Sequence, residues 1–455
     1  MAQQQNNPMM GEMPMGRLMA KMSVPLMLSM LVQSMYNIVD SFFVAKLGMQ
    51  AISALGIAFP IQMLFIALAN GLGVGMNALI SQSFGRGEGN RAARAAGNQL
   101  TMALIAAVGF LLFGLFGTQA YFAWCTDDLL IAQYGTDYLT IVGSCAGAHL
   151  LAVYGERLLQ VTGRTVLSMI TQMVGAVVNI VLDPILIFGL FGAPKMGIRG
   201  AAVATVLGLA AAAVLGLVLH HWRDPQLRVR WRDLRLCQDA GQILKIALPV
   251  ALTTGMSSLM VFGVNAILKQ YVVEIAVFTV YYKLQTFLFM PTQGMMQGLV
   301  PVLGYNYGAK QGARLRQAIF LAVKLCLCIM AAGTLLLQLA PGPVFRLFAD
   351  ANNPEMLAMG IRALRVLSST FVVAGAALVL SNVFQGMGSG TPSMIFGILR
   401  QCAVLLPVLW LLLRTAGAES IWLAFPIAEV VTAVVIWFVF RREYPRRVVP
   451  LLPGE

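Results

Sequence analysis

Residues 22–48 read MSVPLMLSMLVQSMYNIVDSFFVAKLG, a stretch long and apolar enough to cross a lipid bilayer as one helix. It nevertheless carries a carboxylate, Asp40, well inside. A charged Asp near the centre of a membrane helix costs about 2.5–3.5 kcal/mol on insertion scales. Gln33, Tyr36 and Asn37 precede the acid by 7, 4 and 3 residues, which places all of these polar groups on one face of a helix. We therefore expect this face to look onto water or protein rather than lipid.

The composition places the chain among polytopic membrane proteins. Of its 455 residues, 59% are hydrophobic and only 11% are charged, and the mean hydropathy is +0.79. A soluble globular protein carries about 25% charged residues. The apolar runs are long and continuous, whereas a membrane β-barrel would alternate in segments of about 10 residues. The polar, Met-rich start lacks a small-residue cleavage site after a short apolar core, so no removable signal peptide is expected.

The hydrophobic runs predict an all-α fold with twelve transmembrane helices. Several runs exceed the roughly 20 residues needed to span a bilayer, so tilted or protruding helices are expected. The predicted bounds are 22–46, 52–84, 97–118, 130–154, 165–191, 198–221, 244–269, 275–305, 317–340, 357–385, 393–413 and 420–440.

Basic residues are distributed unevenly between alternate loops. With the N-terminus placed in the cytoplasm, the cytoplasmic tails and loops hold 20 Lys and Arg, and the opposite loops hold 6. The positive-inside rule therefore predicts cytoplasmic termini and a multi-pass protein of the cytoplasmic (inner) membrane. The net charge of +13 follows from this topology, so no nucleic-acid partner is expected. The expected partners are the lipid bilayer and small organic molecules, and the chain is expected to act as a monomer.

The two halves of the chain resemble each other at a near-constant offset. Pro25 recurs as Pro249, and Gly85 recurs as Gly308, each glycine standing before a basic loop. A repeated unit of six helices keeps its orientation in the membrane, so the repeat predicts two pseudo-symmetric lobes with a substrate cavity between them. The other matches, all 223 to 225 residues apart, are Gln160 with Gln385, Ser168-Met-Ile with Ser393-Met-Ile, Ile198 with Ile421 and Ala201 with Ala424.

The longest connection follows the sixth predicted helix and separates the two lobes. It is charged and amphipathic, so we expect it to lie along the cytoplasmic membrane surface. The predicted segments are a cytoplasmic N-terminal tail (1–21), an N-lobe of helices 1 to 6 (22–221), the inter-lobe loop (222–243), a C-lobe of helices 7 to 12 (244–440) and a basic cytoplasmic C-terminal tail (441–455).

The fifth predicted helix carries a second polar face. Gln172, Asn179 and Asp183 follow one another at spacings of 7 and 4 residues. Pro184 stands directly after the acid and would bend the helix beside it. The sixth helix adds the hydroxyl group of Thr205.

Asp40 and Asp183 are the candidate ion-coupling residues. If the two approach each other, burial and like-charge repulsion favour protonation, and the pair would exchange protons near neutral pH. The same acids, with the oxygens of Asn179 and Thr205, could instead hold a hard cation such as sodium. The sequence leaves both alternatives open. A competing interpretation is that the acids only stabilise helix packing, although carboxylates inside a membrane are functional by default.

The second half of the chain has no such acid pair. Asn265 and Lys283 are candidates for its cavity wall, and Lys283 would either set the electrostatic potential of the cavity or serve as a structural partner. Glu156 and Arg157 lie near a predicted helix end, where snorkelling or capping accounts for them. The full set of cavity-lining candidates is Gln33, Tyr36, Asn37, Gln172, Asn265 and Lys283.

Signatures of catalysis are missing from the sequence. The six cysteines have no metal-binding spacing and are expected to be buried, inert thiols. The chain contains no Walker loop and no Gly-rich nucleotide-binding pattern. We therefore expect no enzymatic activity and no cofactor beyond a coupling proton or sodium ion.

Several of these strings together resemble the multidrug and toxic compound extrusion (MATE) family, and the resemblance extends from Pro25 to the twelfth helix. It implies two six-helix lobes that rock between inward and outward states, and cation-coupled export of drugs. The strings are IVDSFFVAKLG (38–48), QSFGRGEGNRA (82–92), NIVLDPILIFGL (179–190), GIRGAAVAT (197–205), PVLGYNYGAKQ (301–311), QGMGSGTPSM (385–394) and FPIAEVV (425–431).

The resemblance also implies roles for individual residues. Pro25 matches the helix-one proline implicated in bending that helix. The NorM-like branch keeps a Glu in helix seven and an Asp in helix ten, whereas this chain has Ser257 near the first position and no acid in 366–385. This departure places the chain closer to the DinF-like branch. The residues that match the N-lobe cation or proton site of that branch are Asp40, Asn179, Asp183 and Thr205.

The expected function is therefore secondary antiport by alternating access. The expected exports are organic, cationic and amphipathic drugs or toxic compounds, exchanged for protons or sodium. Two alternatives are a flippase for lipid-linked precursors from the related superfamily and a metabolite carrier of the major-facilitator type. The flippase would require a strongly cationic cavity, and the carrier would lack the strings quoted above. A receptor or channel is a weaker alternative, because acids occur on two helices of a duplicated bundle.

Overall fold

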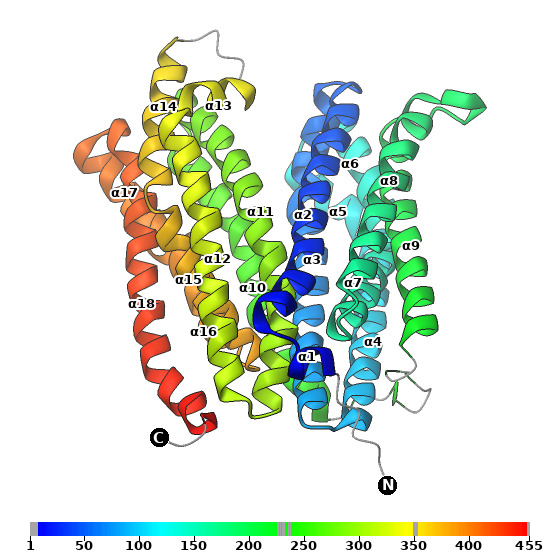
Figure 1. Cartoon of the computed structure of the whole chain (residues 1–455). Helices are drawn as coiled ribbons and strands as arrows, with labels where there is room; N and C mark the ends of the chain where they lie inside the picture. Colours follow the sequence, from blue (N-terminus) through cyan, green and yellow to red (C-terminus); the bar gives the residue numbers. More distant parts are fainter. Residues whose placement is uncertain are drawn as a thin grey trace.

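The computed structural model describes residues 8–224, 227, 229, 233, 234, 236, 238–348 and 354–452, and these residues form helices and short connections without any strand. Most of the predicted inter-lobe loop lies outside the described residues. The first half lies on the right of Figure 1 and the second half on the left. Helix α1 and the last turns of α18 lie at the same end of the bundle (Figure 1). The prediction of an all-α membrane protein is confirmed.

The first half contains six membrane-spanning units. Long apolar runs form them, because a helix satisfies its own backbone hydrogen bonds inside a bilayer. They are preceded by the short helix α1 (Pro8–Glu12). The units are α2 (Met15–Ala45), α3 (Met49–Gly85), α4 with α5 (Gly89–Leu112, Thr118–Cys125) joined by a π-helical turn (Phe113–Gly117), α6 with α7 (Leu129–Ser144, Ala146–Val161), α8 (Thr165–Phe188) and α9 (Ile198–Arg223).

The second half repeats this order of six units. Helix α10 begins at Gln238, earlier than the predicted residue 244. The short helix α13 (Pro341–Phe348) follows the third unit. The units are α10 (Gln238–Ile267), α11 (Val272–Gly308), α12 (Gly312–Leu339), α14 with α15 (Pro354–Ser368, Phe371–Gly386), α16 with α17 (Thr391–Ile398, Leu405–Ala416) joined by a π-helical turn (Leu399–Ala403), and α18 (Ala424–Arg447) preceded by a 3-10 turn (Ala418–Leu423).

Two predicted helices, 130–154 and 357–385, are broken rather than continuous. The axes of α6 and α7 differ by 44°, and those of α14 and α15 differ by 45°. The first break follows the pair Gly143–Ser144, and the second follows Ser368–Ser369, where the hydroxyl of Ser369 bonds to its own helix. Small and hydroxyl-bearing residues of this kind weaken the helical ladder locally. The breaks stand about 225 residues apart, so the repeat includes them.

Glycines bring the two halves into direct backbone contact. On α3, a Cβ added to Gly75 would lie 2.6 Å from the carbonyl oxygen of Ile243 on α10. On α11, a Cβ added to Gly298 would lie 2.6 Å from the carbonyl oxygen of Met22 on α2. Gly71 and Gly294 make similar approaches one turn earlier, so each half contributes a GxxxG pair that lets helices pack closely. These two crossings are related by the offset of 223 residues.

The contact between the halves is concentrated near the end that carries both termini. Residues 75–84 of α3 and 298–306 of α11 are all buried, whereas the first two turns of each helix include exposed residues, such as Met49 and Val272. Gly85 and Gly308 close this packed region, and neither has room for a Cβ. The basic loops follow these glycines, and the charge bias assigns this end to the cytoplasm. We refer to residues 71–85 and 294–308 as the cytoplasmic seal.

Candidate functional site

Helix α2 positions the polar face predicted from its sequence. Asp40 and Tyr36 are half-buried, and Gln33 and Asn37 are exposed. The charge of Asp40 lies within electrostatic range of Asp183 on α8. The structure therefore brings together two acids that are separated by 143 positions in the sequence.

The second acid belongs to a buried cluster between α8 and α9. Asn179 is 3% exposed and Asp183 is 0% exposed. In one orientation the Asn179 amide donates to Thr205 Oγ1 at 3.4 Å. After a half-turn of the amide, its nitrogen donates to Asp183 Oδ2 at 3.2 Å and its oxygen accepts from the Thr205 backbone N–H at 3.1 Å. The second orientation satisfies both ends of the amide, so Asn179 joins the acid to α9.

Asp183 has one oxygen for which no described residue supplies a partner. Its Oδ1 is buried and accepts no hydrogen bond from a described residue. Among the described residues, no Lys, Arg or His lies within 4 Å of the carboxylate. A buried charge without a partner is costly, and such a group takes up a proton or binds a cation instead. This geometry makes Asp183 the strongest candidate for the coupling residue.

The donor set suits a proton or a small hard cation. Carboxylate, amide and hydroxyl oxygens are the ligands that hard cations prefer. Asp183 Oδ1 would be the first ligand of a sodium ion, and Asp40, Asn179 and Thr205 supply further oxygens nearby. Within the described part of the chain, no three His, Cys, Asp or Glu residues are grouped as for a transition metal. The choice between proton and sodium stays a prediction.

Tyr138 is a neighbour of the site that sequence reasoning missed. It is 4% exposed on α6, and its hydroxyl accepts from Gln62 Nε2 on α3 at 2.9 Å. It lies within electrostatic range of both Asp40 and Asp183. A single tyrosine in an apolar run carries no spacing signal toward another helix, so only the folded chain reveals this contact.

Gln172 occupies a different polar cluster from Asp183. Its Nε2 donates to Glu156 Oε2 at 3.0 Å, and the hydroxyl of Ser29 bonds to its side-chain oxygen. These three residues connect α2, α7 and α8. Glu156 is half-buried and has no Lys, Arg or His within 4 Å among the described residues, although it lies within electrostatic range of Arg157. The interpretation of Glu156 as a helix-end residue is wrong, because α7 continues to Val161.

Arg157 is buried in the same half, not snorkelling as predicted. It is 3% exposed, and it donates to Gln160 Oε1 at 2.9 Å and to Asn70 Oδ1 at 3.3 Å. Gln160 in turn donates to Ser168 Oγ at 3.1 Å. Gln160 and Ser168 are two of the residues that recur in the repeat. The network joins α3, α7 and α8, and Arg157 is a structural cation inside it.

Pro25 lies inside a continuous α2 and is buried. Proline has no N–H group, so the carbonyl four residues earlier, that of Lys21, loses its helical partner. Thr165, the first residue of α8, fills this role, since its hydroxyl donates to the Lys21 carbonyl at 2.7 Å. The predicted hinge is therefore held by a hydrogen bond from another helix.

In the second half, the candidates Asn265 and Lys283 are exposed on α10 and α11. No hydrogen bond or ion pair among the described residues joins them to the acids of the first half. The main polar feature of this half is the pair of Arg400 and Glu429, 2.7 Å apart. The Arg400 guanidinium also stands 5.4 Å from the ring centre of Phe289.

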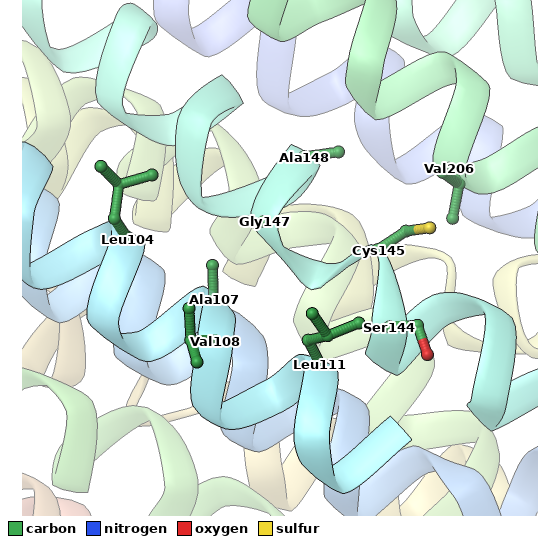
Figure 2. Close-up of a pocket in the computed structure, with 9 residues that line it drawn as sticks. All are labelled: Leu104, Ala107, Val108, Leu111, Ser144, Cys145, Gly147, Ala148 and Val206. Atoms are coloured by element: carbon green, nitrogen blue, oxygen red, sulfur yellow. The ribbon is translucent and has the colours of Figure 1, made fainter. Parts of the chain in front are cut away.

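A hollow of about 430 Å³ lies at the α6–α7 break, but it contains none of the predicted site residues. Figure 2 shows its apolar walls, with Cys145 at the break. Its lining residues are Leu104, Ala107, Val108, Leu111, Ser144, Cys145, Gly147, Ala148 and Val206. Three of them, Leu104, Val108 and Leu111, are exposed on the outer face of α4, so the hollow lies on the lipid side of the bundle.

Known proteins match the chain over nearly its whole length. A family model described as MatE matches residues 25–185 and 246–411. A FAD transporter of Shewanella oneidensis is 22% identical over 439 residues, covering 94% of this chain and 95% of that protein. The multidrug export protein MepA of Staphylococcus haemolyticus is 24% identical over 425 residues, covering 92% of each. A solved structure described as the outward-facing conformation of a multidrug resistance MATE family transporter has a TM-score of 0.89, at 27% identity and 99% coverage of both chains.

Proposed function

Because the chain belongs to the MatE family of membrane transporters, we propose that it is a secondary antiporter that exports cationic, amphipathic organic compounds. The chain is a multi-pass membrane transporter and not an enzyme. The alternative of a major-facilitator carrier is excluded, since the matched family model covers most of both halves. The observation that carries the antiport proposal is the buried Oδ1 of Asp183, which has no partner among the described residues and lies within electrostatic range of Asp40.

The proposed cycle follows from two ligands that compete for one lobe. A proton or cation entering from outside satisfies Asp183 Oδ1 and neutralises the acids. The polar face of α2 then loses its attraction for a positively charged substrate, and α2 repacks about Pro25. Two ligands with opposite preferences for the inward and outward states drive each other by linkage. Where the coupling ion is sodium, Asp40, Asp183, Asn179 and Thr205 would hold it.

A cationic substrate class is supported by the charges of the first half. Among the described residues, no Lys, Arg or His lies within 4 Å of the carboxylates of Asp40, Asp183 and Glu156, although Glu156 lies within electrostatic range of Arg157. One relative is named a FAD transporter, and FAD carries a negatively charged diphosphate. Like charges repel across a cavity of low dielectric constant, so these acids disfavour such a substrate here. The same argument disfavours the alternative of a flippase for pyrophosphate-linked lipids.

The test is transport in liposomes with separately imposed proton and sodium gradients. Wild type is compared with Asp40→Asn and Asp183→Asn, using a fluorescent organic cation and a neutral dye of similar size. We expect one gradient to drive export of the cation, and both variants to lower the gradient-driven rate by at least about tenfold, as for the loss of a coupling site. Full export by Asp183→Asn under either gradient would contradict the mechanism.

A further inference from the structure

Two arginines occupy the same position in the two halves of the chain. Arg91 and Arg314 are 223 residues apart, each in the first turn of the third unit of its half, α4 or α12. Each follows a tight turn whose central residue has a positive φ, 76° at Gly87 and 56° at Lys310. The shared turn aims both side chains in equivalent directions. Each guanidinium reaches across to the opposite half.

Arg91 of the first half binds the beginning of the second half. Its Nε donates to Asp239 Oδ1 at 3.1 Å, and its Nη2 donates to Gln242 Oε1 at 2.9 Å. Both partners lie in the first turns of α10. Arg94 stands 3.7 Å from the other oxygen of Asp239, which is only 6% exposed. A charge-assisted contact therefore ties α4 to the opposite half at the cytoplasmic end.

Arg314 of the second half binds the beginning of the first half. Its Nη2 donates to the carbonyl oxygens of Met10 at 3.2 Å and Met13 at 2.8 Å, where the chain leads into α2. Its Nε donates to Asn306 Oδ1 at 3.2 Å, and Asn306 is 0% exposed. The buried amide thus fixes the guanidinium in the direction of the opposite half.

We propose that Arg91 and Arg314 form a paired cytoplasmic latch that holds the two lobes together in the state shown here. Arg91 binds the first turns of α10, and Arg314 binds the segment that leads into α2, so each arginine contacts the beginning of the other half next to the cytoplasmic seal. Separation of the two lobes at this end would strain both contacts, because each joins a helix of one half to the beginning of the other. The role of the latch in a transport cycle rests on the proposed function, but its effect on the seal does not.

The contacts of Arg91 and Arg314 differ in chemistry, so we expect them to differ in their sensitivity to dissolved salt. Arg91 meets a carboxylate, and its side chain is 23% exposed, so dissolved salt weakens the contact. Arg314 meets backbone carbonyls, which carry no net charge and cannot be protonated near neutral pH. The geometry therefore predicts that only the Arg91 contact is strongly sensitive to salt.

A cysteine in the seal reports its opening. Ser81 on α3 is 1% exposed and packs against Gly304 of α11, so Ser81→Cys places a thiol at the interface of the lobes. The six native cysteines are first replaced by alanine. In inside-out membrane vesicles, a membrane-impermeant maleimide then reaches the thiol only when the cytoplasmic end opens. We expect Arg91→Gln and Arg314→Gln each to raise the labelling rate by about fivefold or more.

The matched control is Arg316→Gln, which removes the same charge from an exposed side chain on the same helix, without an ion pair among the described residues. Asp239→Asn should raise labelling at least as much as Arg91→Gln, because it releases Arg94 as well. The exchange of Arg91→Asp with Asp239→Arg should restore slow labelling, which a merely misfolded protein would not show. Raising salt from about 0.05 to 0.5 M should speed labelling more in the parent than in Arg91→Gln, where only the longer contact of Arg94 with Asp239 remains.

The latch is wrong if Arg91→Gln and Arg314→Gln label at the parent rate, or if Arg316→Gln raises labelling as much as they do. Failure of the charge exchange to restore slow labelling would also overturn it. Gradient-driven export of the organic cation is measured in parallel with the parent protein. A labelling response without export would refute antiport and leave the latch standing, whereas export with unresponsive labelling would refute the latch alone.

Discussion

The first and second halves of this transporter share a scaffold but differ in the charges they enclose. In the first half, Asp183 is buried, and no Lys, Arg or His of the described chain lies within 4 Å of its carboxylate. In the second half, Glu429 is buried beside Arg400 at 2.7 Å. A buried charge with an oppositely charged partner needs no further ligand. A buried charge without such a partner is stabilised when it takes up a proton or binds a cation. Under the proposed function, the buried acid of the second half supports the fold, and the buried acids of the first half serve ion coupling.

The largest expected effect is a difference in the free energy of unfolding between variants at Glu429, which has a cationic partner, and at Asp183, which has none within 4 Å among the described residues. Arg400→Met leaves Glu429 charged and unpaired, and we expect it to lower the free energy of unfolding by about 3–5 kcal/mol. Asp183→Asn removes an unpaired charge, so it should leave the unfolding free energy unchanged or raise it while export fails. Thermal unfolding in detergent compares the stability of the variants, and the liposome assay measures their export. The double variant Arg400→Met/Glu429→Met is the control and should recover most of the loss. Equal destabilisation by Asp183→Asn would break the comparison.

The glycine crossings, in contrast, should behave alike in both halves. Gly75→Ala and Gly298→Ala each place a Cβ 2.6 Å from a carbonyl oxygen of the opposite lobe, and overpacking of this kind costs about 1–3 kcal/mol. We expect both variants to open the cytoplasmic seal to a similar extent, measured by labelling of the Ser81→Cys thiol. Gly56→Ala lies on the same helix as Gly75 but has nothing within 4 Å, so it should be neutral. A defect in only one of the two crossings would contradict the pseudo-symmetry.

Pro25 in α2 and Pro249 in α10 each leave the carbonyl four residues earlier without its helical hydrogen bond, but the neighbouring helix offers a side-chain donor at the matching position only in the first half. The carbonyl released by Pro25 accepts from Thr165, whereas the residue matching Thr165 in the second half is Gly390, which has no side chain to donate. Thr165→Val should destabilise α2 near the proline by about 1–2 kcal/mol, in line with hydrogen bonds between membrane helices. Its turnover number should change more than its apparent substrate affinity, and Thr165→Ser should restore it. Unchanged export by Thr165→Val would exclude this contact from the hinge.

Substitution of Tyr138 is expected to have the smallest effect on the proposed coupling site. Tyr138→Phe removes a buried hydroxyl near both acids but keeps the ring, so a change of about 0.6 kcal/mol, or roughly threefold in apparent ion affinity, is expected. The readout is the proton or sodium concentration that gives half-maximal export. Tyr154→Phe is the matched control, since Tyr154 is equally buried in the same lobe but has no partner among the described hydrogen bonds. An equal shift in both variants would show a general packing effect instead.

Much of the site could be predicted because its signals are local. The spacing of Gln33, Tyr36, Asn37 and Asp40 marks one helix face, and the same holds for Asn179 and Asp183. Gln172 shares that spacing, yet its amide binds Glu156 rather than Asp183, because the 11 residues from Gln172 to Asp183 span about 16 Å along the helix axis at 1.5 Å per residue. Arg157 was misinterpreted for a related reason. Its helix continues to Val161, and hydrophobic runs locate helix ends only to within several residues.

The sequence by itself determined the membrane class, the twelve spans and the duplication, because hydrophobicity, charge bias and recurrence are properties of neighbouring residues along one chain. The tertiary structure alone decided which distant groups meet. Tyr138 lies within electrostatic range of the acids of α2 and α8, Thr165 donates to the carbonyl released by Pro25, and Arg91 and Arg314 reach the opposite lobe. Such contacts depend on the distance and orientation of separate helices, which no spacing within a single helix encodes.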